Sequence, residues 1–372
     1  MKKKLIVFHP ALAPYRIDLF NQFAKDFDAF FYFSRRNLLS QKFDQEQLKL
    51  RTIFSCHYLR GFDLKNRPFR FGILRILFTQ KPDIVLISEF GFIPFLVVFF
   101  RFLFRFKYTI FTLCDDSLSV AIERKGLRNL FRSYILSNIN GAVLISELVK
   151  EWYKSKYYQT NFCVFPIIQN ENIFREQLHA SLILSKEYLN RYNLNNKKVI
   201  LFVGRLHSVK NLPFLIDCFS ELNHADIALV IVGSGDQKNL LQDIVKQKQL
   251  EQKVLFIDRL EGISLMGWYN IGQIFVLPSI YEPFGAVVNE ALLAGLPVLC
   301  SDLAGASSLI QKGKNGDLFS PYDKNMLTRL MEDLIVKSDS LNEASLKIKN
   351  SLMNICFEDS YLHTRNFISE SR

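Results

Sequence analysis

Short runs of consecutive apolar residues alternate with amphipathic stretches along the first half of the chain. Apolar runs at residues 5–8, 83–88, 108–113 and 142–145 indicate strands buried on both faces, as in a parallel sheet covered by helices. Residues 16–27 instead repeat their apolar side chains at helical spacing. This strand–helix–strand rhythm predicts an α/β fold with mostly parallel sheets.

The same rhythm begins again after a polar stretch at residues 190–198. A second series of apolar runs lies at residues 199–203, 227–232, 254–257, 274–277 and 298–300. Two such series in tandem predict two Rossmann-like domains, at residues 1–185 and 190–355. A chain of 372 residues is long enough for two domains of ordinary size.

Composition excludes several classes of protein. With 49% hydrophobic and 22% charged residues, the chain is neither disordered nor fibrous. Six scattered cysteines form no CxxC pair and no cluster with zinc-like spacing, so neither a structural metal nor a disulfide framework is expected. The most apolar stretch, 90–100, is shorter than the about 20 residues of a membrane-spanning helix. The first apolar run is also too short for a signal peptide, and we expect a cytoplasmic protein.

The excess positive charge lies in the first half of the chain. The net charge is +11, and residues 1–180 hold 27 Lys and Arg against 15 Asp and Glu. Such an imbalance predicts an anionic partner for this half: nucleic acid, a lipid surface or a phosphorylated acceptor. No nucleic-acid-binding module is recognisable, so we expect no nucleic acid partner.

Residues 60–75 and 90–107 interleave Arg and Lys with Phe. Arg101 and Arg105 are four apart and would share a helical face. Aromatic bulk with a basic edge favours an interfacial helix on anionic lipid, while the alternative is a core helix between two strands. Both can hold if one face packs inward, and we predict peripheral association with the inner face of the cell membrane.

The candidate chemistry lies at the carboxyl ends of strands in the second series, the edge where open α/β sheets bind ligands. Gly204 and Arg205 follow one strand, and Lys210 comes shortly after. Two cations beside a helix start suit a diphosphate, although a solvated basic turn has the same pattern. Gly233 lies in the turn VGSGD, which is not a full GxGxxG fingerprint and disfavours a conventional NAD site.

A further turn carries two carboxylates. Glu282 precedes a Pro-Phe-Gly turn, and Glu290 lies eight residues on in the helix that this turn opens. Ionised carboxylates only accept hydrogen bonds and therefore suit hydroxyl-rich ligands, while the free amides at residues 284–287 suit a phosphate or a sugar hydroxyl. A carboxylate among Ala, Val and Leu favours function over a solvent-facing helix charge. The small-residue turn at 301–306 is expected to form a wall of the same cleft.

These elements together resemble the retaining glycosyltransferases of family 4, which have the GT-B fold. The similarity is carried by GRL followed by KN, by VGSGD, and by LPSIYEPFGAVVNEALLAGLPVLCSD, in which Glu282 and Glu290 match the family's E-x7-E motif. It is dense over residues 199–325 and weak in the first half. The resemblance implies two facing Rossmann-like domains with the active site in the cleft between them. It also implies a last helix, at about 358–372, that packs back on the first domain.

The resemblance implies roles for individual residues. Arg205 and Lys210 would bind the donor diphosphate and stabilise it as a leaving group, and Glu282 would contact the donor sugar. The remaining donor-binding positions would contact the distal phosphate, the ribose or the base: Gly204, Gly233, Arg259, Leu260, Phe284, Gly285, Ala286, Val287 and Glu290. No metal and no other cofactor is expected, because the two cations take the metal's role.

The first half departs from the family pattern. The residues implied on the acceptor side are His9, Tyr15, Arg16, Asp115 and Asp116. Many family members have a His where this chain has Cys114 or Asp115, which marks a different sugar contact or acceptor. Asp115 and Asp116 are not the D-x-D of metal-dependent enzymes, and the departing phosphate is able to deprotonate the acceptor.

The function that the sequence predicts is that of a retaining, metal-independent hexosyltransferase. It would move a sugar from a nucleotide-sugar to a lipid-linked, polysaccharide or glycolipid acceptor in cell-envelope synthesis. The alternatives are a nucleotide-sugar epimerase or hydrolase of the same fold, and a non-catalytic nucleotide-sugar-binding scaffold at the membrane. The presence of Arg205, Lys210, Glu282 and Glu290 argues against a degenerate site.

Overall fold

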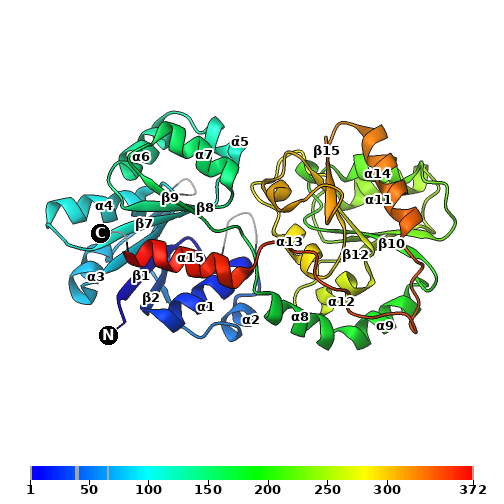
Figure 1. The fold of residues 1–372 in the computed structure, drawn as a ribbon, viewed down its shortest axis with the longest axis horizontal. Coiled ribbons are helices and arrows are strands. Elements are labelled where there is room, and N and C mark those ends of the chain that lie inside the picture. Colours follow the sequence, from blue (N-terminus) through cyan, green and yellow to red (C-terminus); the bar gives the residue numbers. More distant parts are fainter. Residues whose placement is uncertain (1, 38–41, 65–66, 371–372) are drawn as a thin grey trace. The chain divides into compact units, whose positions relative to one another are not determined.

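The computed structural model describes residues 2–37, 42–64 and 67–370 and divides the chain into two compact units (Figure 1). The first unit comprises Met1–Gln169 and Phe357–Arg372, and the second comprises Asn170–Cys356. Each unit is built on a parallel sheet with helices on both faces. The predicted α/β class with two Rossmann-like halves is confirmed.

The first unit contains a seven-stranded parallel sheet. Its strand order is β3 (Cys56–Tyr58), β2 (Asp28–Phe33), β1 (Lys4–His9), β6 (Ile84–Ser88), β7 (Thr109–Cys114), β8 (Gly141–Leu144) and β9 (Asn161–Val164). The order reverses direction between β1 and β6. In open α/β sheets the crevice at such a reversal is the usual ligand site.

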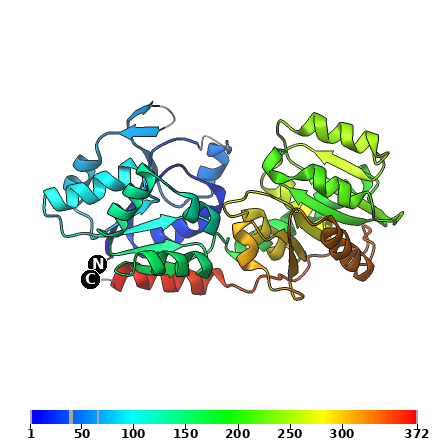
Figure 2. The same cartoon turned by 90° about the horizontal axis from the view of Figure 1, so that it is seen from above.

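Helices and one hairpin complete the first unit. They are η1 (Pro14–Arg16), α1 (Ile17–Asp26), α2 (Gln45–Leu50), α3 (Ile73–Gln80), α4 (Phe92–Leu103), α5 (Leu118–Glu123), α6 (Leu127–Leu136), α7 (Glu147–Lys156) and α15 (Phe357–Glu370). Strands β4 (Gly61–Leu64) and β5 (Arg67–Arg70) pair antiparallel, and Figure 2 shows this hairpin standing away from the main sheet.

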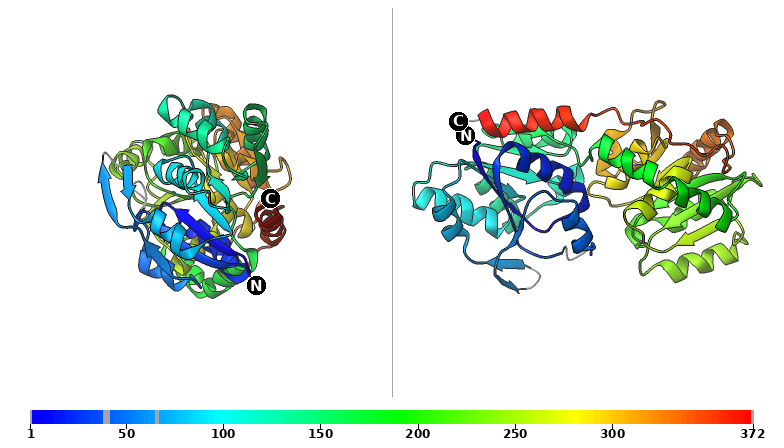
Figure 3. Two further views of the ribbon diagram at one scale, coloured as in Figure 1. Left: turned by 90° about the vertical axis from the view of Figure 1, so that its left-hand side faces the viewer. Right: turned by 90° about the horizontal axis from the view of Figure 1, so that it is seen from below.

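The last helix of the chain, α15, packs on α1 and β9 of the first unit (Figure 3). The buried Tyr361 hydroxyl donates to the Asp26 carboxylate at 2.8 Å and contacts the Gln22 carbonyl at 3.0 Å. The Phe367 ring packs edge-on against Phe111, with ring centroids 5.4 Å apart. The C-terminal segment is thereby tied to the N-terminal unit.

The second unit contains a six-stranded parallel sheet that also reverses once. Its order is β12 (Val254–Ile257), β11 (Ile227–Val232), β10 (Lys198–Val203), β13 (Ile274–Leu277), β14 (Val298–Ser301) and β15 (Gly316–Phe319), with the reversal between β10 and β13. Its helices are α8 (Glu171–Ala180), α9 (Leu182–Arg191), η2 (Ser208–Lys210), α10 (Leu212–Phe219), α11 (Lys238–Gln247), α12 (Ile263–Ile271), α13 (Ala286–Leu293), η3 (Gly305–Leu309) and α14 (Lys324–Lys337).

The division between the units differs from the predicted boundary near residue 190. Helices α8 and α9 pack on α12 and therefore belong to the second unit. The buried Asn270 amide donates to the Leu178 carbonyl at 3.0 Å and to the Ser185 hydroxyl at 3.1 Å. Because these bonds cross from α12 to α8 and α9, the polar stretch 190–198 joins α9 to β10 inside one unit.

Helix α4 also differs from its prediction. It ends at Leu103, and Arg105 lies beyond it with a left-handed backbone φ of 52°, so the predicted shared helical face of Arg101 and Arg105 is wrong. The Arg101 guanidinium donates inward, to the Asn140 side chain at 3.1 Å and the Asn138 carbonyl at 2.5 Å. Among the described residues, no helix combines the length and apolarity needed to cross a bilayer.

We predict that Tyr361→Phe weakens the docking of α15. The change removes a buried hydroxyl that bonds Asp26 and Gln22, at a cost of about 1–2 kcal/mol in the free energy of unfolding. Urea denaturation of the full chain measures it. Tyr158→Phe is the matched control, because the Tyr158 side chain is 81% exposed in the same unit. Equal losses in both variants would contradict the assigned role of the Tyr361 hydroxyl.

Candidate active site

The predicted catalytic residues Lys210 and Glu282 meet at the strand reversal of the second unit. Lys210 ends η2, after β10, and Glu282 follows β13, so the two residues come from the strands on either side of the reversal. The Lys210 ammonium donates directly to the Glu282 carboxylate. The loops are also joined by their backbones, since the Ile280 amide donates to the Val209 carbonyl at 2.9 Å.

This ion pair is largely shielded from water. The side chains of Lys210 and Glu282 are only 11% and 13% exposed. Removing two charges from water is costly unless they pair closely, and removing one partner of such a pair is more costly still. The pair therefore places a fixed cation and a fixed carboxylate at the edge of the sheet where a ligand is expected.

Glycines bring the loops after β10 and β11 into close contact. A Cβ at Gly233 would lie 1.8 Å from the Gly204 carbonyl oxygen, and a Cβ at Gly235 would lie 2.2 Å from the Leu206 carbonyl oxygen. Close packing of the two loops therefore requires glycine at positions 233 and 235, independently of any ligand. The exposed Arg205 lies on the loop that these contacts hold in place.

The predicted phosphate-binding turn opens α13. Gly285 caps the helix with a left-handed φ of 98°, and a Cβ there would come 3.2 Å from the Glu282 side chain. The amides of Ala286 and Val287 lie in the first turn, where an α-helix offers them no acceptor of its own. The buried Phe284 carbonyl accepts from the Ala306 amide at 2.7 Å, which joins this turn to the 301–306 turn.

Glu290 is oriented by a residue that the sequence analysis missed. The hydroxyl of the fully buried Tyr269, on α12, donates to one Glu290 carboxylate oxygen at 2.8 Å. Burial and the adjacent carboxylate raise the pKa of Tyr269 well above its ordinary value, so the hydroxyl keeps its proton. Nothing in the sequence around Tyr269 marks it as a site residue, because the contact joins two different helices.

The two residues expected near the nucleobase of the donor lie at the edge of the sheet, away from the strand reversal. Arg259 and Leu260 follow β12, the edge strand, and Arg259 pairs with Glu261 in the same loop. No three His, Cys, Asp or Glu side chains gather as a metal site within the described residues. The expected metal independence stays a prediction.

The predicted acceptor-side residues lie at the carboxyl edge of the first unit's sheet. The buried Arg16 forms an ion pair with Asp115, which follows β7. His9 is buried at the end of β1, where its Nδ1 contacts the Ala11 carbonyl at 2.9 Å. Burial and the Arg16 charge lower the pKa of His9 to about 4, so the ring is neutral at physiological pH. Burial has the opposite effect on the neighbouring Tyr15 and raises the pKa of its hydroxyl, so this group also stays neutral.

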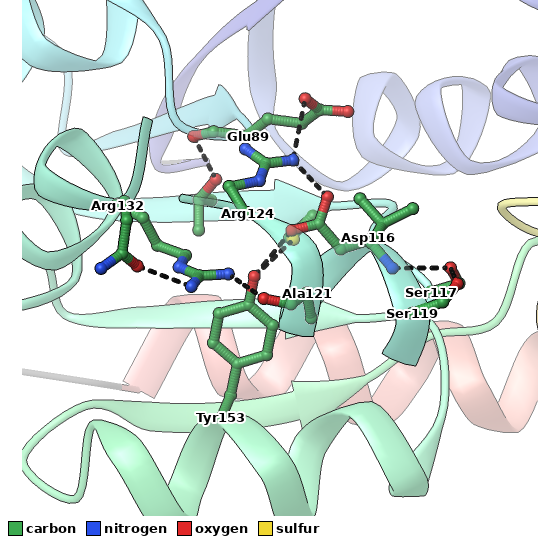
Figure 4. Close-up of polar contacts among 12 residues, drawn as sticks. Glu89, Asp116, Ser117, Ser119, Ala121, Arg124, Arg132 and Tyr153 are labelled. Carbon is green, nitrogen blue, oxygen red and sulfur yellow. Dashed lines mark hydrogen bonds and ion pairs between the residues drawn. The ribbon is translucent and has the colours of Figure 1, made fainter. Parts of the chain in front are cut away.

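Asp116 is buried in a polar cluster rather than displayed at the surface. Its carboxylate accepts from the Tyr153 hydroxyl at 2.7 Å and from the Arg124 guanidinium at 2.5 Å (Figure 4). Cys114, where many family members have a His, is buried with its sulfur 3.7 Å from the Tyr153 oxygen. Asp116 and Cys114 therefore belong to the buried packing at the end of β7, whereas the Asp115 side chain is partly exposed there.

We predict strong energetic coupling between Lys210 and Glu282. In a double-mutant cycle with Lys210→Met and Glu282→Gln, each single change leaves a poorly solvated charge unpaired, and the coupling should reach about 1–3 kcal/mol. Urea denaturation of the four proteins measures it.

The control cycle uses Lys238→Met and Asp258→Asn, an ion pair of the same unit whose side chains are 32% and 78% exposed. Its coupling should stay below about 1 kcal/mol. A Lys210–Glu282 coupling no larger than that of the control would show that the central pair is as solvated as a surface pair.

Comparison with known proteins finds a family model that matches most of the second unit. Residues 185–350 match the family model described as glycosyl transferases group 1. An uncharacterised glycosyltransferase of Methanocaldococcus jannaschii is 39% identical over 171 residues, which are 44% of each chain. A second uncharacterised glycosyltransferase, from Haemophilus influenzae, is 26% identical over 60% of this chain and 64% of its own. The first of these matches spans less than half of the relative.

Solved structures match the whole chain at low sequence identity. Two structures of HepE of Anabaena align over 99% of this chain and 98% of their own. The complex with UDP has a TM-score of 0.71 and 14% identity, and the complex with UDP-glucose has a TM-score of 0.68 and 15% identity. WaaG, a glycosyltransferase involved in lipopolysaccharide biosynthesis, aligns over 98% and 99% with a TM-score of 0.66 and 15% identity. Such likeness shows the fold alone. The chain has the GT-B fold, and its residues 185–350 match the family model of the glycosyl transferases of group 1.

Proposed function

We propose that this protein is a retaining hexosyltransferase that uses a nucleotide-sugar donor. The observation that carries the proposal is the shielded Lys210–Glu282 pair at the strand reversal of a unit that matches the group 1 family. The UDP and UDP-glucose complexes of HepE, which has the same fold, support a nucleotide-sugar as donor.

The second unit supplies the groups that a departing nucleoside diphosphate needs. When the bond between the sugar and the diphosphate breaks, negative charge develops on the phosphate oxygens, and Arg205 and Lys210 stabilise it. The helix-start amides of Ala286 and Val287 add donors of fixed position. Glu282 accepts from the donor sugar once the phosphate draws Lys210 away. No metal takes part in this proposal.

Glu290 binds the ribose hydroxyls in the proposed donor complex. Its carboxylate is held by Tyr269 through one oxygen, which fixes the direction of the side chain on α13. A carboxylate oriented in this way discriminates for a diol, because two adjacent hydroxyls donate to it together. The site is thus expected to select a nucleoside diphosphate over inorganic diphosphate.

The proposed acceptor is a lipid-linked sugar, a glycolipid or a polysaccharide of the cell envelope. The first unit carries the chain's excess positive charge, which suits an anionic or membrane-bound acceptor. WaaG, which shares the fold, is involved in lipopolysaccharide biosynthesis. Tyr15 and Asp115, at the carboxyl edge of the first unit, are the proposed acceptor-side contacts.

A basic aromatic patch supports peripheral membrane association on the cytoplasmic side. It consists of five exposed residues at and beyond the end of α4: Phe102, Leu103, Phe104, Arg105 and Lys107. Phe102 is the most exposed, at 83%. Exposed apolar groups beside cations favour the surface of an anionic bilayer. The patch replaces the predicted Arg101–Arg105 face, because Arg101 bonds within the unit.

We predict that one class of nucleotide-sugar binds selectively and that Arg205 acts mainly on its leaving group. UDP-glucose, UDP-galactose, UDP-N-acetylglucosamine, GDP-mannose and ADP-glucose are compared by thermal shift without added metal. With the donor that binds, Arg205→Ala should slow release of the nucleoside diphosphate by about a hundredfold.

Arg191→Ala is the control, since Arg191 is an exposed arginine of the same unit that precedes β10. Its rate should equal that of the wild type. Absence of binding to every nucleotide-sugar would contradict the donor assignment. Wild-type rates in Arg205→Ala would remove Arg205 from the diphosphate site.

We predict that the patch at the end of α4 binds anionic vesicles. Replacing Arg105 and Lys107 by Glu should reduce binding to mixed phosphatidylcholine–phosphatidylglycerol vesicles by roughly 30-fold, as expected for about 1 kcal/mol per basic residue. Sedimentation with vesicles measures it. Lys246→Glu with Lys312→Glu makes the same charge change on exposed lysines of the second unit. Equal loss in both double variants would mean that net charge, and not this patch, binds the membrane.

A further inference from the structure

A pocket at the carboxyl edge of the first unit's sheet is lined by arginines. Its volume is about 460 Å³, and it lies where the chain leaves β2 and β3 and enters the β4–β5 hairpin. Four of the described residues that line it are Arg35, Arg36, Arg60 and Arg70, and none of the described lining residues is acidic. Like charges gathered around one hollow raise its positive potential and attract an anion.

Two of these arginines are held in place by one carboxylate. Asp63, on β4, lies 2.9 Å from the Arg35 guanidinium and 2.7 Å from that of Arg70. The buried Arg70 also donates to the Ser34 carbonyl and, at 2.7 Å, to the Phe62 carbonyl. These bonds tie the hairpin to the end of β2 and fix one wall of the pocket. Because a single carboxylate balances only one of the two cations, this wall keeps a positive charge.

The other two arginines have no acidic partner. Arg36 and Arg60 are exposed at the pocket, and within the described residues neither pairs with a carboxylate. The Arg36 guanidinium instead lies over the Tyr58 ring, 5.9 Å from the ring centroid. A guanidinium stacked in this way keeps its in-plane N–H groups available for an oxyanion.

Tyr58 adds an unsatisfied donor to the wall of the pocket. Its hydroxyl is buried and, in the part of the chain that the structure describes, makes no hydrogen bond. Burial raises the pKa of Tyr58, so the hydroxyl keeps its proton. Buried polar groups in folded proteins nearly always have a partner. An unsatisfied donor beside four arginines therefore favours a ligand rich in oxygen atoms.

The pocket adjoins the loop that carries the acceptor-side residues. The Ser34 amide donates to the His9 carbonyl at 3.0 Å, and the Arg35 amide donates to the Pro10 carbonyl at 2.9 Å. Strands β1 and β2 are parallel, so both end at this edge of the sheet. The pocket is thus bonded, within one unit, to the loop after β1 that leads to Tyr15.

We propose that this pocket binds a phosphoryl group carried by the acceptor. The inference rests on the proposed glycosyl transfer and narrows its acceptor to a phosphorylated one. Guanidinium groups bind phosphate through paired N–H···O bonds, and a phosphate offers more oxygen atoms than a carboxylate. Small-molecule sites typically measure about 300–1,000 Å³, so this pocket has room for a phosphate and part of the group that it esterifies.

The test measures the binding of phosphorylated probes by isothermal titration calorimetry. Arg205→Ala is the common background, because the second unit is itself proposed to bind a diphosphate. The probes are glucose 6-phosphate, geranyl diphosphate and, as a carboxylate, glucuronate. At least one phosphorylated probe should bind about tenfold more tightly than glucuronate. Replacing Arg36 and Arg60 by Ala should weaken that binding by about tenfold or more, since charge-assisted hydrogen bonds are lost.

A matched control removes the same charge elsewhere in the first unit. Arg75→Ala with Lys154→Ala changes two exposed residues, on α3 and α7, that do not line the pocket. Its affinity should stay within about twofold of the background, because salt screens distant surface charges. Arg36 and Arg60 are exposed, so their replacement should leave the urea midpoint unchanged. That measurement separates lost binding from lost folding.

Each outcome bears on the pocket or on the proposed function. Tighter binding of geranyl diphosphate would support the pocket with a lipid-linked phosphate, and tighter binding of glucose 6-phosphate would support it with a soluble one. Binding of neither, equally tight binding of glucuronate, or an equal loss in the control variant would overturn the pocket. Failure to bind any nucleotide-sugar would overturn the proposed function and its acceptor. The titrations contain no donor, so they still test phosphoryl binding in that case.

Discussion

Parallel pairing with a single reversal of strand order is the constraint on which the rest of this structure depends. All main-sheet strands in each unit run parallel, so every loop after a strand emerges at the same edge. The order reverses between β1 and β6 and between β10 and β13, which are the positions where open α/β sheets usually bind ligands. Lys210 and Glu282 flank one reversal, and Glu89 follows a strand of the other. The strand order therefore determines at which edge of each sheet these groups lie.

Charge pairing within each unit engages several of the ionisable side chains at the strand ends. The cations at the strand ends are matched to nearby carboxylates: Lys210 to Glu282, Arg16 to Asp115 and Arg124 to Asp116. Such matching limits the cost of taking charges out of water. The Arg124 guanidinium lies 2.5 Å from Asp116 and 3.9 Å from Glu89, and burial together with the Asp116 and Asp115 carboxylates raises the pKa of Glu89.

The sequence predicts those features that local pattern determines. The strands at 227–232, 254–257 and 274–277 match their predicted bounds, because each is an apolar run ended by polar or turn residues. Strands β2, β9 and β15 escaped prediction, and each of them is only partly buried. The placement of α8 and α9 depends on Asn270, far along the chain, and so did not follow from a polar stretch.

In the candidate site, too, the sequence did not predict contacts between residues that lie far apart in the chain. Motif spacing identified Lys210 and Glu282 separately, but their ion pair joins residues 72 positions apart. The Tyr269–Glu290 and Arg124–Asp116 contacts likewise form only in the folded chain. The two reversals therefore share one topology and differ in electrostatics. The reversal of the second unit holds the shielded Lys210–Glu282 pair, whereas the reversal of the first unit holds Glu89, whose carboxylate lies 3.9 Å from the Arg124 guanidinium. The same kind of strand order therefore presents different side chains in the two units, through the few residues that follow the strands.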